Sequence, residues 1–296
     1  MHINIVTITS GWILQKIAER TVNNYPNDDI RFTISHYAVD PLADVNYYID
    51  IENCYKGQKT KLDIAYFSHA EGGTVGGLIN EFKARNAYNN LDGVISMNRR
   101  YTDMLIGTGF PTNKVATIVP GETKTLFPLR KIVIGVVSRA TYAWYGKSFV
   151  GDFFNNYDCS CFKFRFLGRD WDSIFPIIKE RGIDAEFISD VDYSIYPEFY
   201  KNIDYLLIPG LWTAGPMSMQ EALSTGLPII AADVGFVNYE FMADYVFSPG
   251  DVVGLSAILD SIKAPILSRR AQVENMSWEK YSVDVVNFIK KIKGVV

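Results

Sequence analysis

The sequence predicts an α/β protein made of two Rossmann-like, doubly wound domains. Short, nearly continuous apolar runs alternate with segments of helical periodicity, as expected when buried parallel strands alternate with covering helices. The 296 residues also exceed the usual size of one hydrophobic core, which indicates two domains of about 150 residues. A segment containing Pro128, at 123–130, precedes a fresh apolar strand, so we place one domain at 1–128 and the other at 129–296.

The first domain begins with the pattern of a buried strand followed by a helix. Residues 3–8 are apolar and largely β-branched, and a Ser-Gly turn separates them from a run at 13–22 in which apolar residues recur at helical spacing. Further short strands are expected at 31–36, 45–50 and 62–69.

The second domain repeats this alternation. Strands are expected at 132–137, 161–168, 184–188 and 204–209, with a helix at 195–202 before the last of them. Asp251 is a favourable N-cap for a helix at 252–263, and Ser277 begins the last helix.

The stretch at 209–239 is the most informative part of the chain. A strand stops at a Pro-Gly pair, a loop of small residues follows, and a helical run ends at Gly226, a residue typical of C-caps, before a second apolar strand. The stretch therefore predicts a strand-loop-helix-strand unit.

The helix in this unit presents its amino end to the carboxyl edge of the sheet. It is entered through Gly215 and Pro216, so the free backbone N–H groups around Met217 and Ser218 and the positive end of the helix dipole can bind phosphate. Glu221 lies further along the helix, where its carboxylate could accept hydrogen bonds from a ribose diol. A solvated Glu on an ordinary helix is the alternative.

Two cations follow the first strand of the second domain. Arg139 comes directly after this strand, and Lys147 lies at the start of the next helix, so both can point into a cleft and neutralise a departing diphosphate. The alternative is that they are ordinary exposed side chains.

Two residues of the first domain are further candidates. His69 ends the strand at 62–69, and strand carboxyl ends face the ligand in open α/β sheets. A structural histidine is the alternative. The glycines at 72–77 do not match a dinucleotide fingerprint and indicate a flexible loop. Gly11, in the first loop, could allow close approach of a sugar or could be a plain turn glycine.

Composition excludes several classes of protein. The net charge of −4, with no basic excess in either half, argues against nucleic acid as a partner. Three cysteines without CxxC spacing indicate neither a disulfide framework nor a zinc site. No apolar run approaches the roughly 20 residues of a membrane span, so we expect a cytoplasmic protein without a transmembrane segment, for which peripheral membrane contact stays open.

The second domain resembles the GT-B glycosyltransferases, in particular the retaining GT4-type family. The run Glu221-Ala-Leu-Ser-Thr-Gly-Leu-Pro-Ile-Ile-Ala matches the second half of the family's donor-binding motif. The family has a first Glu eight positions earlier, associated with the donor sugar, where this chain has Thr213. The block at 92–123 is moderately similar to the end of the family's first domain, and in relatives the last helix commonly crosses back onto that domain.

The resemblance implies an architecture and roles for the candidate residues. The two domains would face each other across a cleft, with the acceptor on the first domain and the nucleotide sugar on the second. Arg139 and Lys147 would bind the donor diphosphate together with the helix end at 215–218, Glu221 would hold the ribose, and His69 would lie near the donor sugar. The glycine before Lys147 and the long loop depart from the family's Lys-Gly pattern.

The function that follows is transfer of a sugar from a nucleotide-sugar donor, such as a UDP- or GDP-sugar, to a glycan, lipid-linked or small-molecule acceptor. The resemblance implies retention. We take no Asp-x-Asp pair of the sequence as a clamp for a metal-bound diphosphate, so we expect independence of metal and no other cofactor. A sugar-nucleotide-binding homologue, inactive because of Thr213, is one alternative. An epimerase or an inverting transferase of the same fold is another.

Overall fold

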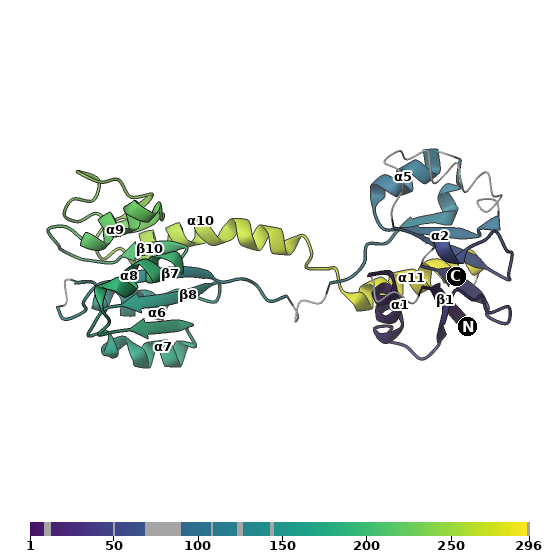
Figure 1. The fold of residues 1–296 in the computed structure, drawn as a ribbon, viewed down its shortest axis with the longest axis horizontal. Coiled ribbons are helices and arrows are strands. Elements are labelled where there is room, and N and C mark those ends of the chain that lie inside the picture. Colours follow the sequence, from purple (N-terminus) through teal and green to yellow (C-terminus); the bar gives the residue numbers. More distant parts are fainter. Residues whose placement is uncertain are drawn as a thin grey trace. The chain divides into compact units, whose positions relative to one another are not determined.

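The structure is a computed structural model that describes residues 1–8, 13–49, 51–68, 90–107, 109–122, 127–142 and 145–294. Gly11 and His69, two of the predicted site residues, lie outside the described residues. The chain divides into two compact units (Figure 1). Unit 1 consists of Met1–Phe127 and Gln272–Val296, and unit 2 consists of Pro128–Ala271.

Unit 1 contains a six-stranded parallel sheet with the strand order β2-β1-β3-β4-β5-β6. Its strands are β1 (His2–Thr7), β2 (Arg31–His36), β3 (Val45–Tyr48), β4 (Asp63–Phe67), β5 (Gly93–Ser96) and β6 (Val115–Thr117), the last preceded by the 3-10 helix η1 (Thr112–Lys114). The strand order reverses at β1, as in doubly wound sheets.

Helices cover both faces of this sheet. Helices α1 (Ile13–Asn23) and α11 (Trp278–Lys293) pack against one face, and α2 (Ile51–Cys54) and α5 (Arg99–Gly107) pack against the other. Successive strand residues point to opposite faces, so both faces are apolar and the strands read as continuous hydrophobic runs.

The last helix of the chain belongs to unit 1. The Ser277 hydroxyl accepts a hydrogen bond from the Lys280 backbone N–H at 3.0 Å, which confirms the predicted start of this helix. Tyr281 is buried against the sheet, and its hydroxyl lies 3.4 Å from that of Tyr47 on β3. Lys290 forms an ion pair with Asp29 at 2.7 Å.

Unit 2 contains a second six-stranded parallel sheet, with the order β12-β11-β10-β7-β8-β9. Its strands are β7 (Ile132–Val137), β8 (Phe162–Leu167), β9 (Ala185–Ile188), β10 (Tyr205–Ile208), β11 (Ile229–Ala232) and β12 (Tyr245–Phe247). Its helices are α6 (Lys147–Asn156), α7 (Phe175–Arg181), α8 (Tyr196–Lys201), α9 (Met217–Thr225) and α10 (Val252–Ala271), with 3-10 turns η3 (Asp172–Ile174) and η4 (Tyr193–Ile195).

Both faces of this sheet are covered as well. Helices α6, α7 and α10 pack on the face toward which Ile134 and Val136 point, while α8 and α9 pack on the face of Val133 and Val137. The two parallel sheets with helices on both faces confirm the predicted α/β class with two Rossmann-like domains.

Helix α10 is longer than predicted. The sequence predicted a helix at 252–263. The helix instead continues to Ala271, with Pro265 inside it, and Ile262 and Ile266 pack on either side of that position against the core of unit 2. The predicted N-cap is confirmed, since the Asp251 carboxylate accepts from the Gly254 N–H at 2.9 Å. None of the helices in the described residues combines the length and apolar character that a membrane span needs.

Candidate functional site

The strand order of unit 2 reverses beside β7, which pairs with β8 on one side and with β10 on the other. In open α/β sheets, ligands bind outside the carboxyl ends of the strands at such a point. The segments that follow β7 and β10 therefore define the candidate site.

Gly146 brings these two segments together. It precedes α6 with φ of 90°, and a Cβ atom added to it would lie 2.1 Å from the carbonyl oxygen of Pro209, just after β10. Glycine alone allows this backbone approach and this conformation without strain. The contact fixes the start of α6, and therefore Lys147, beside the loop that follows β10.

Arg139 follows β7 and lines a hollow of about 180 Å³ at the carboxyl ends of β7, β8 and β9. Arg169, on the same hollow, forms an ion pair with Asp190 at 2.6 Å. Within the described residues Arg139 has no such partner, so its guanidinium is available to an anion. The complete lining is Val137, Ser138, Arg139, Leu167, Gly168, Arg169, Ile188, Asp190, Val191 and Tyr196.

The backbone before Arg139 is held from two sides. The indole N–H of Trp171 donates to the carbonyl oxygen of Ser138 at 3.1 Å, and a Cβ atom on Gly168 would lie 1.9 Å from the same oxygen. The Ser138 hydroxyl oxygen is buried and has no hydrogen-bond partner in the described structure. A ligand in the hollow could use this group, because buried polar atoms are normally hydrogen-bonded.

Lys147 is the first residue of α6, and its Nζ donates to the carbonyl oxygen of Asp170 at 3.2 Å. The Asp170 carboxylate accepts from the Thr141 hydroxyl, in the loop after β7. Arg139 borders residues 168 and 169, and Lys147 binds residue 170. The structure thus places the two predicted cations around one short loop that follows β8.

The amino end of α9 has no side-chain cap. Its N-cap is Pro216, and no hydrogen bond to the backbone N–H of Met217 or Ser218 occurs among the described residues. A Cβ atom on Gly215 would lie 2.0 Å from the Phe236 ring, so a larger residue at this position would require the ring to move. Among the described residues these two N–H groups have no acceptor, which is compatible with the predicted phosphate site.

Glu221 is held by two tyrosines. The Tyr200 hydroxyl donates to Oε2 at 2.5 Å, and the Tyr193 hydroxyl donates to Oε1 at 2.7 Å. Tyr200 is buried, whereas the Tyr193 side chain is 64% exposed. Burial and the Glu221 carboxylate raise the pKa of Tyr200 well above its usual value, so this hydroxyl remains a neutral donor.

Tyr193 also connects Glu221 to the hollow, because its ring lies 4.8 Å from that of Tyr196, which lines the hollow. No hydrogen bond or ion pair joins Glu221 directly to Arg139 or Lys147 in the described part of the chain. Both carboxylate oxygens of Glu221 are hydrogen-bonded, although the side chain is only half-buried and the bond to Tyr193 lies at the surface.

Sequence reasoning missed Tyr193, Tyr200 and Arg169. Arg169 could have been found, since it follows a predicted strand closely, as Arg139 does. The two tyrosines lie 28 and 21 residues before Glu221, and only the tertiary fold brings them to it.

Thr213 is the residue at which the sequence departs from the GT4-type motif that it resembles. It is half-buried in the loop after β10, and its carbonyl oxygen would lie 2.7 Å from a Cβ atom on Gly235, in the loop after β11. The tight packing of these two loops shapes the entrance to α9. In the described residues, no group of three or more His, Cys, Asp or Glu side chains could hold a metal ion.

Comparison with known proteins gives distant likenesses. No protein family model matches the chain. Protein CapJ of Staphylococcus aureus is 27% identical over 96 residues, which are 32% of this chain and 24% of CapJ, so the chain spans about a quarter of that relative's length.

Among solved structures, the lipopolysaccharide outer core galactosyltransferase WaaB in its apo form has a TM-score of 0.41 and 13% identity, with all of both chains covered. HepE of Anabaena in complex with UDP and glucose has a TM-score of 0.39 and 11% identity, covering 100% of this chain and 98% of HepE. The catalytic domain of cholesterol-α-glucosyltransferase from Helicobacter pylori has a TM-score of 0.39 and 19% identity, covering 53% and 98%. These likenesses are too distant to assign an activity.

Proposed function

We propose that the chain is a glycosyltransferase of the GT-B type that binds a nucleotide-sugar donor on unit 2 and an acceptor on unit 1. One observation carries the proposal. At the strand reversal of unit 2, an uncapped helix end, two cations and a carboxylate held by hydroxyl groups surround the carboxyl edge of a parallel sheet.

The diphosphate of the donor would bind to the positive groups of this site. Arg139 would form charge-assisted hydrogen bonds from the wall of the hollow, Lys147 would contribute a second charge, and the N–H groups of Met217 and Ser218 would bind a phosphate oxygen. These groups would stabilise the charge that develops on the leaving diphosphate. We propose that the reaction needs no metal, because fixed cations and amides would supply this stabilisation.

The ribose would bind Glu221. Tyr200 holds one carboxylate oxygen from the buried side, whereas the exposed Tyr193 holds the other. A ribose hydroxyl could take the place of the Tyr193 hydroxyl. The hydrogen bond between Tyr193 and Glu221 lies at the surface, and both hydroxyls are neutral donors of similar strength. Tyr200 would then keep the carboxylate in position.

The finer assignments follow the GT4-type resemblance of the sequence. We propose retention of the anomeric configuration, with attack on the face that the diphosphate leaves and the leaving phosphate taking the acceptor proton. His69 would lie near the donor sugar. The donor would be a UDP- or GDP-sugar, the acceptor a glycan, lipid-linked or small molecule, and the place of action the cytoplasm.

A panel assay tests this function. The full chain is incubated with UDP-, GDP- and ADP-sugars, and hydrolysis and transfer are followed by chromatography, with the anomer of the product read by NMR. Turnover of at least one donor, lost in Arg139→Ala, is expected. Tight nucleotide binding without turnover of any donor would instead indicate a binding homologue in which Thr213 has removed the chemistry.

A further inference from the structure

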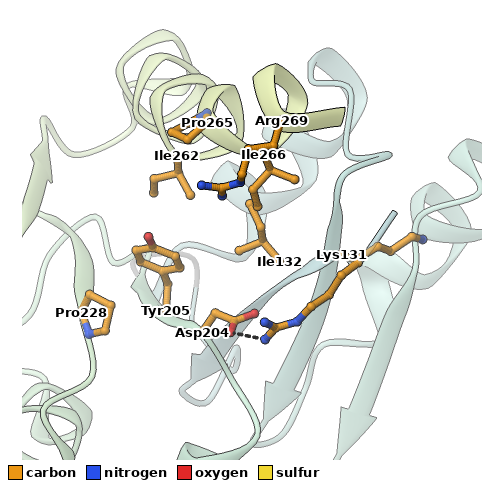
Figure 2. A pocket seen from close by; sticks show the side chains of 10 residues that line it. Lys131, Ile132, Asp204, Tyr205, Pro228, Ile262, Pro265, Ile266 and Arg269 are labelled. Carbon is orange, nitrogen blue, oxygen red and sulfur yellow. Dashed lines mark hydrogen bonds and ion pairs between the residues drawn. The ribbon is translucent and has the colours of Figure 1, made fainter. Parts of the chain in front are cut away.

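A second hollow, of about 540 Å³, opens at the opposite edge of the unit 2 sheet (Figure 2). Its walls come from the first residues of β7 and β10 and from the second half of α10. The lining residues are Arg130, Lys131, Ile132, Asp204, Tyr205, Pro228, Ile262, Pro265, Ile266 and Arg269. The carboxyl-edge site contributes none of these residues.

The centre of this cavity is apolar. Ile132 and Ile262 form its floor, and Ile266 packs beside them. A hollow of several hundred cubic ångströms with an apolar lining and a few polar groups has the character of a small-molecule site. An apolar group bound there would be removed from water and gain the corresponding burial energy.

The one carboxylate on the cavity is already neutralised. Asp204 accepts from the Arg130 guanidinium at 2.8 Å with one oxygen and from the Val133 backbone N–H at 2.9 Å with the other. Lys131 is likewise paired, with Asp184 at 3.0 Å. These groups therefore leave no unpaired negative charge to attract a cationic ligand.

Arg269 differs from the other cations of the cavity. Its guanidinium has no hydrogen bond or ion pair within the described residues, and it extends from α10 over the cavity, next to Ile262 (Figure 2). The Tyr205 side chain rises from β10 toward the same space, and its hydroxyl has no hydrogen-bond partner in the described part of the chain either. Two unpaired donors, one of them charged, thus lie above an apolar floor.

We propose that this cavity binds a small amphipathic anion, with its carboxylate or phosphate on Arg269 and Tyr205 and its apolar body on Ile132, Ile262 and Ile266. A guanidinium matches the two oxygens of such a group and can bind them with two parallel hydrogen bonds.

The cavity lies where the chain enters and leaves unit 2. Arg130 lies two residues after the point where the chain enters unit 2, and Arg269 lies two residues before the point where it leaves. Residues of both segments therefore line the cavity. The site is separate from the proposed donor site, so it can exist whatever the chain's activity.

The test uses octanoate, octan-1-ol and octylammonium as probes of equal chain length and different charge. Binding to the full chain is measured by calorimetry for the wild type, Arg269→Met and Arg270→Met. Arg270 is the matched control, because it neighbours Arg269 on α10 and does not line the cavity. A further variant, Ile266→Glu, places a carboxylate inside the cavity.

We expect saturable binding of octanoate to the wild type and to Arg270→Met, with affinity about tenfold lower in Arg269→Met, the effect of one charge-assisted hydrogen bond. Octan-1-ol should bind more weakly and equally to all three, and Ile266→Glu should not bind octanoate. Co-sedimentation with phosphatidylglycerol vesicles separates the two sources of such an anion. Arg269-dependent sedimentation identifies a bilayer lipid, and octanoate binding without sedimentation identifies a free metabolite.

Three results would overturn the proposal. They are no octanoate binding by the wild type, equal losses in Arg269→Met and Arg270→Met, and octylammonium or octan-1-ol binding as tightly as octanoate. Thermal unfolding of each variant, compared with the wild type, shows that a loss of binding is not a loss of folding.

Discussion

The hydroxyl of Tyr200 donates a hydrogen bond of 2.5 Å to Oε2 of Glu221 from beneath α9. Tyr200 comes from α8, is buried, and also lies 3.5 Å from the carbonyl oxygen of Ser218. The bond fixes the orientation of the carboxylate relative to the amino end of α9. It therefore links the proposed ribose contact to the proposed phosphate contact.

Replacing Tyr200 by Phe should weaken UDP binding. The change removes the buried donor to Glu221 and leaves the ring in place, so we expect a loss of about 1 kcal/mol, the typical net value of a hydrogen bond. Calorimetry with UDP measures this loss. The same substitution should have little effect on binding of a 2′,3′-dideoxy analogue, which has no diol for Glu221.

Replacing Tyr193 by Phe should have the opposite effect or none. The Tyr193 hydroxyl occupies Oε1 of Glu221 at the surface, where a ribose hydroxyl would bind, so its removal frees the acceptor. We expect UDP affinity to stay equal or to rise slightly, by about 0.5 kcal/mol at most. If Tyr193→Phe weakens UDP binding as much as Tyr200→Phe does, Tyr193 is a ligand contact and the proposed exchange of hydroxyl groups is wrong.

Arg139→Ala should reduce the affinity for UDP by about 2 kcal/mol, because it removes a charge-assisted contact with the diphosphate. Arg130→Ala provides the control, since Arg130 is an exposed arginine of the same unit whose partner is Asp204. Titration calorimetry should show near wild-type affinity for Arg130→Ala. Equal UDP affinities of the wild type and Arg139→Ala would show that the diphosphate does not bind in this hollow.

Gly146→Ala should destabilise unit 2 strongly. The added Cβ atom would clash with the Pro209 carbonyl and would also require a residue other than glycine at φ of 90°. Gly182→Ala is matched to it, because Gly182 has φ of 62° at a helix end and no atom lies within 4 Å of where its Cβ would be. In denaturant unfolding, the free energy of unfolding should fall by about 1 kcal/mol for Gly182→Ala, the cost of the left-handed backbone alone. For Gly146→Ala it should fall by several kcal/mol. Equal losses would mean that the contact of the two loops has no energetic role.

Asp44 should make the stability of unit 1 depend on pH at the acid end. Its carboxylate accepts from the His2 backbone N–H and pairs with Lys293 on α11, both at 2.9 Å, and these contacts lower the pKa of Asp44 to about 2. The folded-state pKa lies below the unfolded one, so the stabilisation is present above about pH 4 and is lost as the pH falls toward about 2. Because the pair is partly exposed, we expect less than about 1 kcal/mol. The difference in unfolding free energy between wild type and Asp44→Asn should shrink between about pH 5 and pH 2, and a constant difference would contradict this.

Local sequence signals predicted the ends of several elements. Gly226 has φ of 73° and ends α9, Asp251 caps α10, and Ser277 caps α11, in each case because the stabilising contact lies within a few residues of the signal. The apolar runs likewise predicted most strands of both sheets, since strands buried on both faces must be apolar throughout.

Tertiary contacts were not accessible from the sequence. The predicted end of α10 was wrong because packing of Ile262 and Ile266 on the core outweighs the effect of Pro265. The partners of Glu221 are set by how α8 and η4 pack beside α9, which no spacing reveals. The hydroxyls of Tyr47 and Tyr281 lie 3.4 Å apart although the two residues are 234 positions apart in the sequence. Only the resemblance to a known family suggested that the last helix returns to the first domain.

A crystal structure of the full chain with UDP tests the central claim most directly. The account predicts the diphosphate within hydrogen-bond distance of the Arg139 guanidinium and of the Met217 and Ser218 N–H groups, with the ribose hydroxyls on Glu221. A nucleotide bound elsewhere on the chain, or an Arg139 guanidinium turned away from a bound diphosphate, would contradict it.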